Sequence, residues 1–205
     1  MFLSAGFPAG THPANFNAMK LSIFIGLGII ALSSAGRVEA QGQDQFALGI
    51  SGGVSIPSGI GADNHKLGPN GALMFGIGAV DSPFGVRFDG MYSALGSKTG
   101  TGTLGLGKAR VTSVSVNFLF NLVGQDERVY FVGGAGGYNY RPDGAGQRAT
   151  NDFAINGGLG LWIPGVNGFI EARLFNMYRA LPDPATGLRG KKSLRLYPIN
   201  FGLMF

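Results

Sequence analysis

Thr112-Ser-Val-Ser-Val-Asn-Phe-Leu-Phe-Asn-Leu122 is the longest alternating stretch of this chain. Apolar residues occupy every second position from Val114 to Leu122, and Ser113, Ser115 and Asn117 alternate with the first of them. Successive side chains of a β-strand point to opposite faces, so this period of two predicts a strand with one apolar and one polar face.

The same alternation recurs in seven further segments, and we find no convincing helical stripe after residue 41. The apolar members of these segments lie within residues 46–56, 73–79, 86–92, 130–140, 153–163, 170–178 and 197–205. The interleaved positions carry glycine, serine, asparagine or charged residues. The sequence therefore predicts an all-β fold of eight strands in which one face is apolar and the other is polar or made of very small side chains.

The lengths of the connections favour a transmembrane barrel over a soluble sandwich or a lipocalin-like barrel. Short connections at 81–83, 124–127 and 164–168 alternate with long polar ones at 57–70, 95–108, 141–151 and 181–192. Short turns on one side and long loops on the other are typical of bacterial outer-membrane barrels. The strands run for about 9–13 residues, which suits a tilted crossing of the bilayer. We expect the last strand, ending at Phe205, to pair with the first, so that no edge remains.

Composition excludes several other classes of protein. Of 205 residues 45% are hydrophobic and only 13% are charged, which disfavours disorder. The 37 glycines show no three-residue period, so collagen is excluded. Because cysteine is absent, the chain has no disulfide, thiolate metal site, cysteine nucleophile or lipoprotein anchor. A net charge of +5 is a mild basic bias.

The first 40 residues read as a targeting segment. Lys20 precedes an apolar run from Leu21 to Leu32, and Val38-Glu-Ala40 offers small residues at a cleavage site before Gln41. The alternative, a transmembrane helix, needs about 20 apolar residues. We therefore divide the chain into an N-terminal extension with a cleaved signal peptide (1–40) and a barrel domain (41–205). Met19 is a second candidate start.

Four segments resemble small outer-membrane β-barrel domain proteins of the porin-like and opacity-like kind. They are Tyr130-Phe-Val-Gly-Gly-Ala-Gly-Gly-Tyr138, Phe153-Ala-Ile-Asn-Gly-Gly-Leu-Gly-Leu161, Phe169-Ile-Glu-Ala-Arg173 and Leu196-Tyr-Pro-Ile-Asn-Phe-Gly-Leu-Met-Phe205. The resemblance covers roughly residues 45–205 and implies an eight-stranded antiparallel up-and-down barrel. It also implies that the barrel-assembly machinery reads the last strand, through Tyr197, Ile199, Phe201, Leu203 and Phe205. No catalytic residue comes with it.

The most informative charges are Arg87, Asp89, Glu171 and Arg173, which stand on the polar face of two predicted strands. Facing lipid, each basic residue would cost about 2–4 kcal/mol. Facing the lumen, the four sum to zero and can pair. We expect a structural ion-pair network inside the barrel, with a gated ion path as the functional alternative.

Enzymatic and cofactor chemistry find little support. The mature segment has a single histidine, His65, which we expect to be exposed in the first long loop, and one histidine does not assemble a hydrolase triad with confidence. Gly102-Thr-Leu-Gly-Leu-Gly-Lys108 mimics a phosphate-binding loop, but Ala109 stands where that motif needs Ser or Thr. We expect no catalytic residue, no metal and no cofactor.

Basic residues concentrate in and beside the long connections. The candidates for contacts with anions are Lys98, Lys108, Arg110, Arg189, Lys191 and Lys192. They form either a solvated rim or a surface for lipopolysaccharide phosphates or an acidic polymer. We expect outer-membrane lipid, lipopolysaccharide and the assembly machinery as partners, no nucleic acid, and a monomer. The predicted function is non-enzymatic support of the Gram-negative envelope or surface adhesion, and the alternative is a narrow porin-like channel.

Overall fold

The computed structural model describes residues 46–78, 83–98, 106–122, 129–144, 146–163, 165–181 and 192–205. The predicted signal peptide, its cleavage site and the alternative start lie outside these residues. Within them, no helix is long and apolar enough to cross a bilayer.

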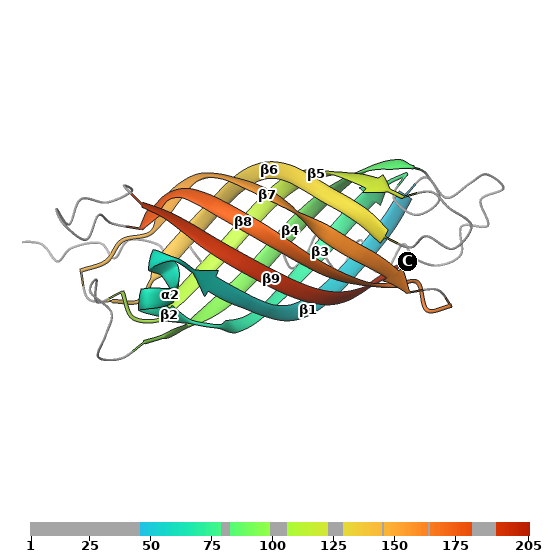
Figure 1. Cartoon of the computed structure of the whole chain (residues 1–205). Helices are drawn as coiled ribbons and strands as arrows, with labels where there is room; N and C mark the ends of the chain where they lie inside the picture. Colours follow the sequence, from blue (N-terminus) through green and yellow to red (C-terminus); the bar gives the residue numbers. More distant parts are fainter. Residues whose placement is uncertain are drawn as a thin grey trace, which may run out of the picture. The chain divides into compact units, whose positions relative to one another are not determined.

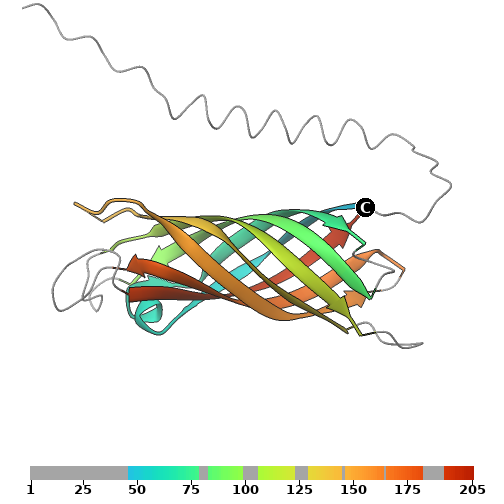
Figure 2. The same cartoon turned by 90° about the horizontal axis from the view of Figure 1, so that it is seen from above.

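Eight long antiparallel strands form a closed barrel (Figures 1 and 2). They are β1 (Phe46–Ser58), β3 (Gly68–Ile77), β4 (Phe84–Ser97), β5 (Ala109–Asn121), β6 (Val129–Pro142), β7 (Thr150–Ile163), β8 (Gly168–Leu181) and β9 (Lys192–Met204). Each strand pairs with the next one, and β9 pairs with β1. Leu48 and Phe205 close the seam with two backbone hydrogen bonds of 2.9 and 2.7 Å. The predicted fold is confirmed.

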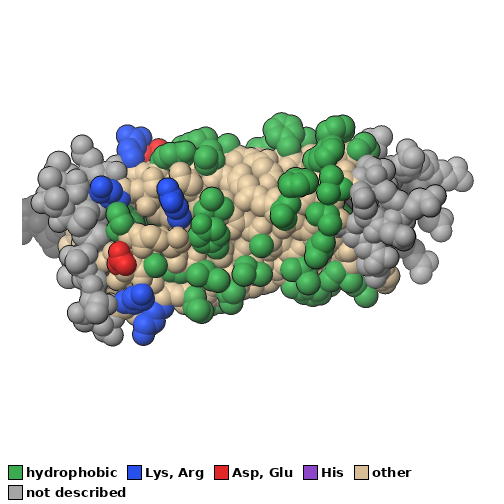
Figure 3. Space-filling view, viewed as in Figure 1, with side chains coloured by type: hydrophobic (Ala, Val, Ile, Leu, Met, Phe, Trp, Pro, Cys, Tyr) green, Lys and Arg blue, Asp and Glu red, His purple; other side chains and the backbone are tan. Residues whose placement is uncertain are grey.

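The outer wall is apolar over most of its height. Outward positions of every strand carry exposed large hydrophobic side chains, for example Phe118 at 68% and Leu73 at 60% exposure. Figure 3 shows these side chains spread over the wall, with Lys and Arg gathered toward the end where α2 (Ile60–Asn64) lies. An apolar surface of this extent would be a severe aggregation hazard in water. The barrel is therefore a transmembrane one, with lipid around the wall.

The first long connection is more ordered than the sequence predicts. Residues 57–70 were expected to be a loop, but β1 continues to Ser58 and β3 begins at Gly68. Between them α2 is followed by the two-residue strand β2 (His65–Lys66), which pairs with the end of β4. The reason is packing: Gly61 of α2 lies so close to Leu194 that a Cβ there would collide with that side chain. This segment covers one side of the loop end of the barrel.

The tyrosine residues of β6 face the lumen, whereas their alternation suggested that they face lipid. Tyr130, Val132, Tyr138 and Tyr140 alternate as a lipid-facing set would, yet all four are buried in the lumen. Outward positions of β6 instead carry small residues, among them Gly133 and Gly137. The alternation was correct, but its apolar face is the inner one.

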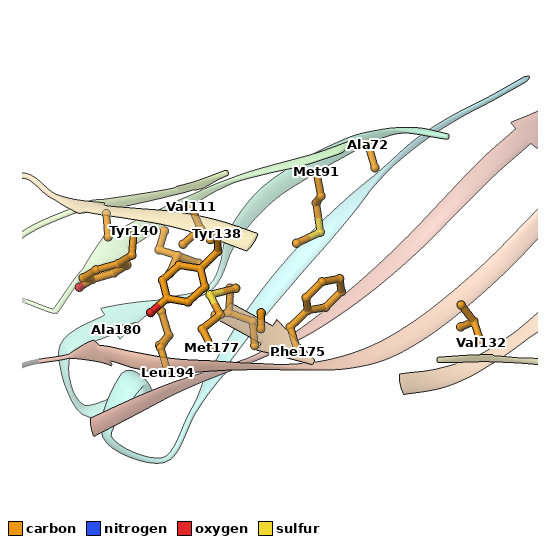
Figure 4. Close-up of a cluster of buried hydrophobic side chains, with 14 of the residues drawn as sticks. Ala72, Met91, Val111, Val132, Tyr138, Tyr140, Phe175, Met177, Ala180 and Leu194 are labelled. Atoms are coloured by element: carbon orange, nitrogen blue, oxygen red, sulfur yellow. The ribbon is translucent and has the colours of Figure 1, made fainter. Parts of the chain in front are cut away.

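The lumen is also less polar than expected. Near α2 it is filled by a compact group of apolar side chains (Figure 4), which includes Val111, Tyr138, Tyr140, Met177, Ala180 and Leu194. Arg87, Asp89, Glu171 and Arg173 sit in the half nearer the short turns, a few residues after the starts of β4 and β8. Apolar side chains such as Phe169 are buried in that half as well, and polar ones such as Ser55 and Ser93 are buried in the half nearer α2. The expectation of a lumen filled by polar and very small side chains is therefore only partly correct, because apolar side chains fill much of both halves.

A glycine-to-alanine substitution should change the stability of the barrel differently at inward and outward positions of β6. A Cβ at Gly134 would collide with the carbonyl oxygen of Val116, whereas at Gly133 the nearest atom, the carbonyl oxygen of Asn156, is 3.8 Å away. We expect Gly134→Ala to destabilise the barrel by about 2 kcal/mol through overpacking. Gly133→Ala, the control, should leave stability unchanged or slightly raised. The measurement is the urea midpoint of the heat-modifiable folded band, and equal midpoints would contradict the assigned faces.

Candidate functional site

The lumen contains a closed set of ion pairs that joins opposite walls of the barrel. The Arg87 guanidinium donates from Nε to Asp89 Oδ1 (2.8 Å) and from Nη2 to Glu171 Oε2 (2.8 Å). Arg87 and Asp89 lie on β4 and Glu171 lies on β8, and three strands separate β4 from β8 in either direction around the barrel. The Arg87–Glu171 pair therefore crosses the lumen.

Arg173 completes the set from the β8 side. Its Nη1 lies 2.7 Å from Asp89 Oδ2 and its Nε lies 2.5 Å from Glu171 Oε1. Tyr130 of β6 adds a neutral donor, because its hydroxyl donates to Glu171 Oε2 at 2.8 Å. The structure thus brings together the four charges singled out in the sequence. It adds Tyr130, whose alternation pattern had marked it only as a strand residue.

These charges are removed from bulk water. The side chain of Arg87 is fully buried, and those of Asp89, Glu171 and Arg173 are at most 2% exposed. Removing charges from water is expensive, and only close pairing with further hydrogen bonds offsets the cost. The set neutralises itself, so it can hold β4 and β8 at a fixed separation.

An asparagine pair extends this layer toward β5 and β7. The Asn156 side-chain amide donates to Asn117 Oδ1 at 2.8 Å, and Asn117 donates to Ser115 Oγ at 3.1 Å. Arg87 and Arg173 also lie over the rings of Phe169 and Phe175, at 5.9 and 5.4 Å from the ring centroids. Polar and aromatic contacts therefore surround the ion pairs on several sides.

His65 closes the loop end of the lumen and is not the exposed loop residue that we expected. It is 1% exposed, and its Nε2 shares a 2.8 Å hydrogen bond with the Tyr140 hydroxyl. The two rings meet edge to face at 6.0 Å. The buried position arises because β2 pairs with Gly96 and Ser97 at the end of β4 and so turns His65 inward. Burial lowers the pKa of His65, since the charged imidazolium loses its hydration.

The predicted anion-binding residues do not converge on one point. Lys98 follows β4, Lys108 precedes β5, and Arg110 lies on the outer face of β5, where it approaches Asp143 at 3.4 Å. Lys192 begins β9, on the opposite side of the barrel. Arg189 and Lys191 lie outside the described residues. The residues that the structure describes thus form part of a rim and not a single pocket.

Sequence reasoning did not single out Arg141 as a site residue. It faces outward on β6, directly opposite Arg110. The sequence does contain a feature that predicts this pair: Arg110 is the second residue of its strand and Arg141 is the last but one of the next strand, so an antiparallel pairing places them opposite each other.

The last strand presents its aromatic and aliphatic side chains to lipid. Four of these residues, Tyr197, Ile199, Phe201 and Phe205, are between 41% and 74% exposed, and Leu203 is partly exposed. Their role in assembly stays a prediction. Among the residues that the structure describes, no group of three metal-ligating side chains lies together.

Comparison with known proteins gives matches only among solved structures. No protein-family model and no curated protein matches the chain. One similar structure is Ail, the attachment invasion locus protein of Yersinia pestis, in complex with the heparin analogue sucrose octasulfate, at 15% identity and a TM-score of 0.47 over 78% of this chain and 96% of that chain. Ail in a phospholipid bilayer nanodisc matches at 17% identity and a TM-score of 0.48, over 78% of this chain and 99% of that one.

The ion-pair set predicts a large asymmetry between single and paired substitutions. Glu171→Gln leaves Arg87 and Arg173 with one carboxylate between them, and we expect it to cost about 3 kcal/mol. The double variant Glu171→Gln/Arg173→Gln keeps the set neutral and should cost less than the single one. Urea midpoints of the refolded variants measure both. If Glu171→Ala and Arg173→Ala each leave the midpoint unchanged, the network has no structural role.

Burial of His65 predicts that stability falls in mild acid. Its pKa is lower in the folded state than the unfolded value of about 6.5, so the unfolded chain binds more protons as the pH decreases. The stabilisation by neutral His65 is complete above the unfolded pKa and is lost as the pH falls toward the folded one. We expect the difference in urea midpoint between pH 7.5 and pH 5 to shrink in His65→Phe. An unchanged difference would contradict this origin.

Proposed function

We propose that the chain is a non-enzymatic protein of the Gram-negative outer membrane that supports envelope integrity or surface adhesion through its basic extracellular loops. The observation that carries this proposal is the filled lumen. Eight strands leave an interior just wide enough for side chains. Here the ion pairs lie in the half nearer the turns, and buried apolar side chains fill space along the lumen, most densely near α2. A barrel filled in this way presents its loops as its working surface.

The charge of the loop end supports an acidic partner. Outward-facing or exposed basic residues of the described chain stand at this end, including Lys66, Arg110, Arg141, Lys192 and Arg195. Two carboxylates, Asp143 and Asp152, are engaged there by Arg110 and Arg179. A basic rim attracts phosphate or sulfate groups over about 8 Å at physiological salt. Lipopolysaccharide and acidic surface polymers have these groups.

A narrow channel is the second candidate, favoured by one observation. Several buried polar atoms in the lumen, among them Ser51 Oγ, Asn70 Oδ1 and Asn200 Oδ1, have no hydrogen-bond partner within the described residues. Such atoms are suited to bind a file of water. The ion pairs across the lumen oppose conduction along it.

Planar-bilayer recording and adhesion assays separate the two functions. We expect the refolded barrel to give no steady conductance steps. We expect vesicles carrying it to adhere to a surface coated with a sulfated polysaccharide. Adhesion should weaken several-fold when the salt concentration rises from about 50 to about 300 mM, because salt screens the loop charges.

The loop variant Lys98→Gln/Lys108→Gln/Arg189→Gln/Lys191→Gln/Lys192→Gln should lose this adhesion while migrating as a folded barrel. Its control is Arg87→Gln/Glu171→Gln, which alters the lumen and leaves the rim unchanged. Two results together would favour the channel instead: steady single-channel steps from the unmodified protein, and equal adhesion by the loop variant and the unmodified protein.

A further inference from the structure

A shallow groove runs along the outer face of β6. From the loop end toward the turns, the outward positions are Arg141, Asn139, Gly137, Ala135, Gly133 and Phe131. The neighbouring outward residues are larger: Val114, Val116 and Phe118 lie opposite on β5, and Phe153 and Ile155 lie opposite on β7. At Gly137 and Ala135 the small side chains of β6 thus lie between larger ones on both sides, and at Gly133 only the β5 neighbour, Phe118, is large.

Packing of the barrel does not require these outward glycines. A Cβ at Gly133 or Gly137 would have no neighbour closer than 3.8 or 4.0 Å, respectively. At Gly157 of β7, the register partner of Gly133, it would have none closer than 3.8 Å. The inward glycines of the same strand, Gly134 and Gly136, lie directly against the backbone of β5 and have no room for a Cβ. The groove is therefore a property of the lipid-facing surface and not a by-product of lumen packing.

Two hollows mark the ends of this groove. One, of about 510 Å³, lies at the loop end and is lined by Thr112, Val114, Gly137, Asn139 and Asn151 among others. The other, of about 770 Å³, lies at the turn end and extends from Phe131 and Gly133 across β5 to Val86 and Phe84 of β4 and Ile77 of β3. Polar side chains such as Asn139 and Asn151 line part of the first, and both hollows are mainly apolar. This lining suits a hydrocarbon tail whose polar head lies at the loop end.

A pair of like charges stands at the head of the groove. Arg110 and Arg141 are directly opposite in the β5–β6 register, and both point outward. Like charges in directly opposed positions destabilise a sheet. Asp143 approaches Arg110 at 3.4 Å, and within the described residues Arg141 has no ion-pair partner. An anion between the two guanidinium groups would remove the repulsion, and phosphate is well suited to such donors.

We propose that this groove binds one phosphorylated glycolipid of the outer leaflet, with a phosphate on Arg110 and Arg141 and an acyl chain along Gly137, Ala135 and Gly133. From Gly137 to Gly133 the strand advances by about 13 Å, which compares with about 15 Å for half of the hydrocarbon core. The occupant is a lipid because the groove lies in the apolar wall and opens to its outside. The inference rests on the proposed function and deepens it, since it assigns one of its candidate partners to a site on the wall that includes Arg110.

Retention of lipid A by the folded barrel tests the site. The refolded chain is inserted into phosphatidylcholine vesicles containing a few per cent of diphosphoryl lipid A, extracted in mild detergent and weighed by native mass spectrometry. We expect a one-to-one complex with lipid A. We expect the occupancy of this complex to fall at least tenfold in Gly133→Leu/Gly137→Leu and in Arg110→Gln/Arg141→Gln. We expect the unmodified protein to retain dephosphorylated lipid A as poorly as the arginine variant retains diphosphoryl lipid A.

Gly52→Leu is the matched control. Gly52 is an outward glycine of β1, where a Cβ would lie 3.8 Å from its nearest neighbour, the carbonyl oxygen of Asn70. Because β1 contains no basic residue, this variant should retain lipid A as the unmodified protein does. Ala135→Leu fills the groove at a position that already carries a side chain, and it replaces the glycine variant if that one does not show heat-modifiable migration.

Three results would overturn the site. They are normal retention by both groove-filling variants, equal loss in Gly52→Leu, and retention that does not depend on the phosphates. Loss in the arginine variant alone would reduce the interaction to attraction at the rim and would also overturn the groove. A chain that never enters the vesicles would overturn the membrane placement itself, which separates that failure from the others.

Discussion

The structure depends on one constraint, that a strand surrounded by hydrocarbon must satisfy every backbone N–H and C=O within the protein. The β1–β9 seam meets it, with Leu48 and Phe205 exchanging two backbone hydrogen bonds where the cylinder closes. Closure forces each strand to present one face to lipid and the other to a narrow interior. The apolar exposure of the wall and the crowding of the lumen are both consequences of this closure.

The interior meets that crowding in two chemically different ways. In the half nearer the turns, Arg87 reaches Glu171 on the opposite wall, and Tyr130 donates to the same carboxylate. In the half nearer α2, aromatic and aliphatic side chains pack together, and His65 shares a hydrogen bond with Tyr140 at the loop end. The first arrangement is directional and sets distances between strands. The second is non-directional and excludes water by volume.

Period-two patterning predicted the strands and placed the four charges on one face, and the connection lengths together with the family resemblance predicted closure into a barrel. It failed where the two faces of a strand look alike. On β6, Gly133 and Gly137 outside are as small as Gly134 and Gly136 inside, so alternation carries no contrast. Only the register with β5 and β7 decides that Tyr138 and Tyr140 point inward. The burial of His65 likewise depends on β2 pairing with Ser97, a contact that spans a long stretch of chain.

The ion pair that crosses the lumen also bears on how the barrel is completed. Arg87 and Glu171 are 84 residues apart, and they belong to strands that are never neighbours in the sheet. Until β8 has arrived, Arg87 and Asp89 face an unfinished cylinder without the carboxylate and guanidinium of the far wall. Arg87 already pairs with Asp89 on β4, and Arg173 pairs with Glu171 on β8, so each strand brings a neutral pair. Completion of the circle therefore adds the contacts across the lumen, Arg87 with Glu171 and Arg173 with Asp89, which no partial barrel can form.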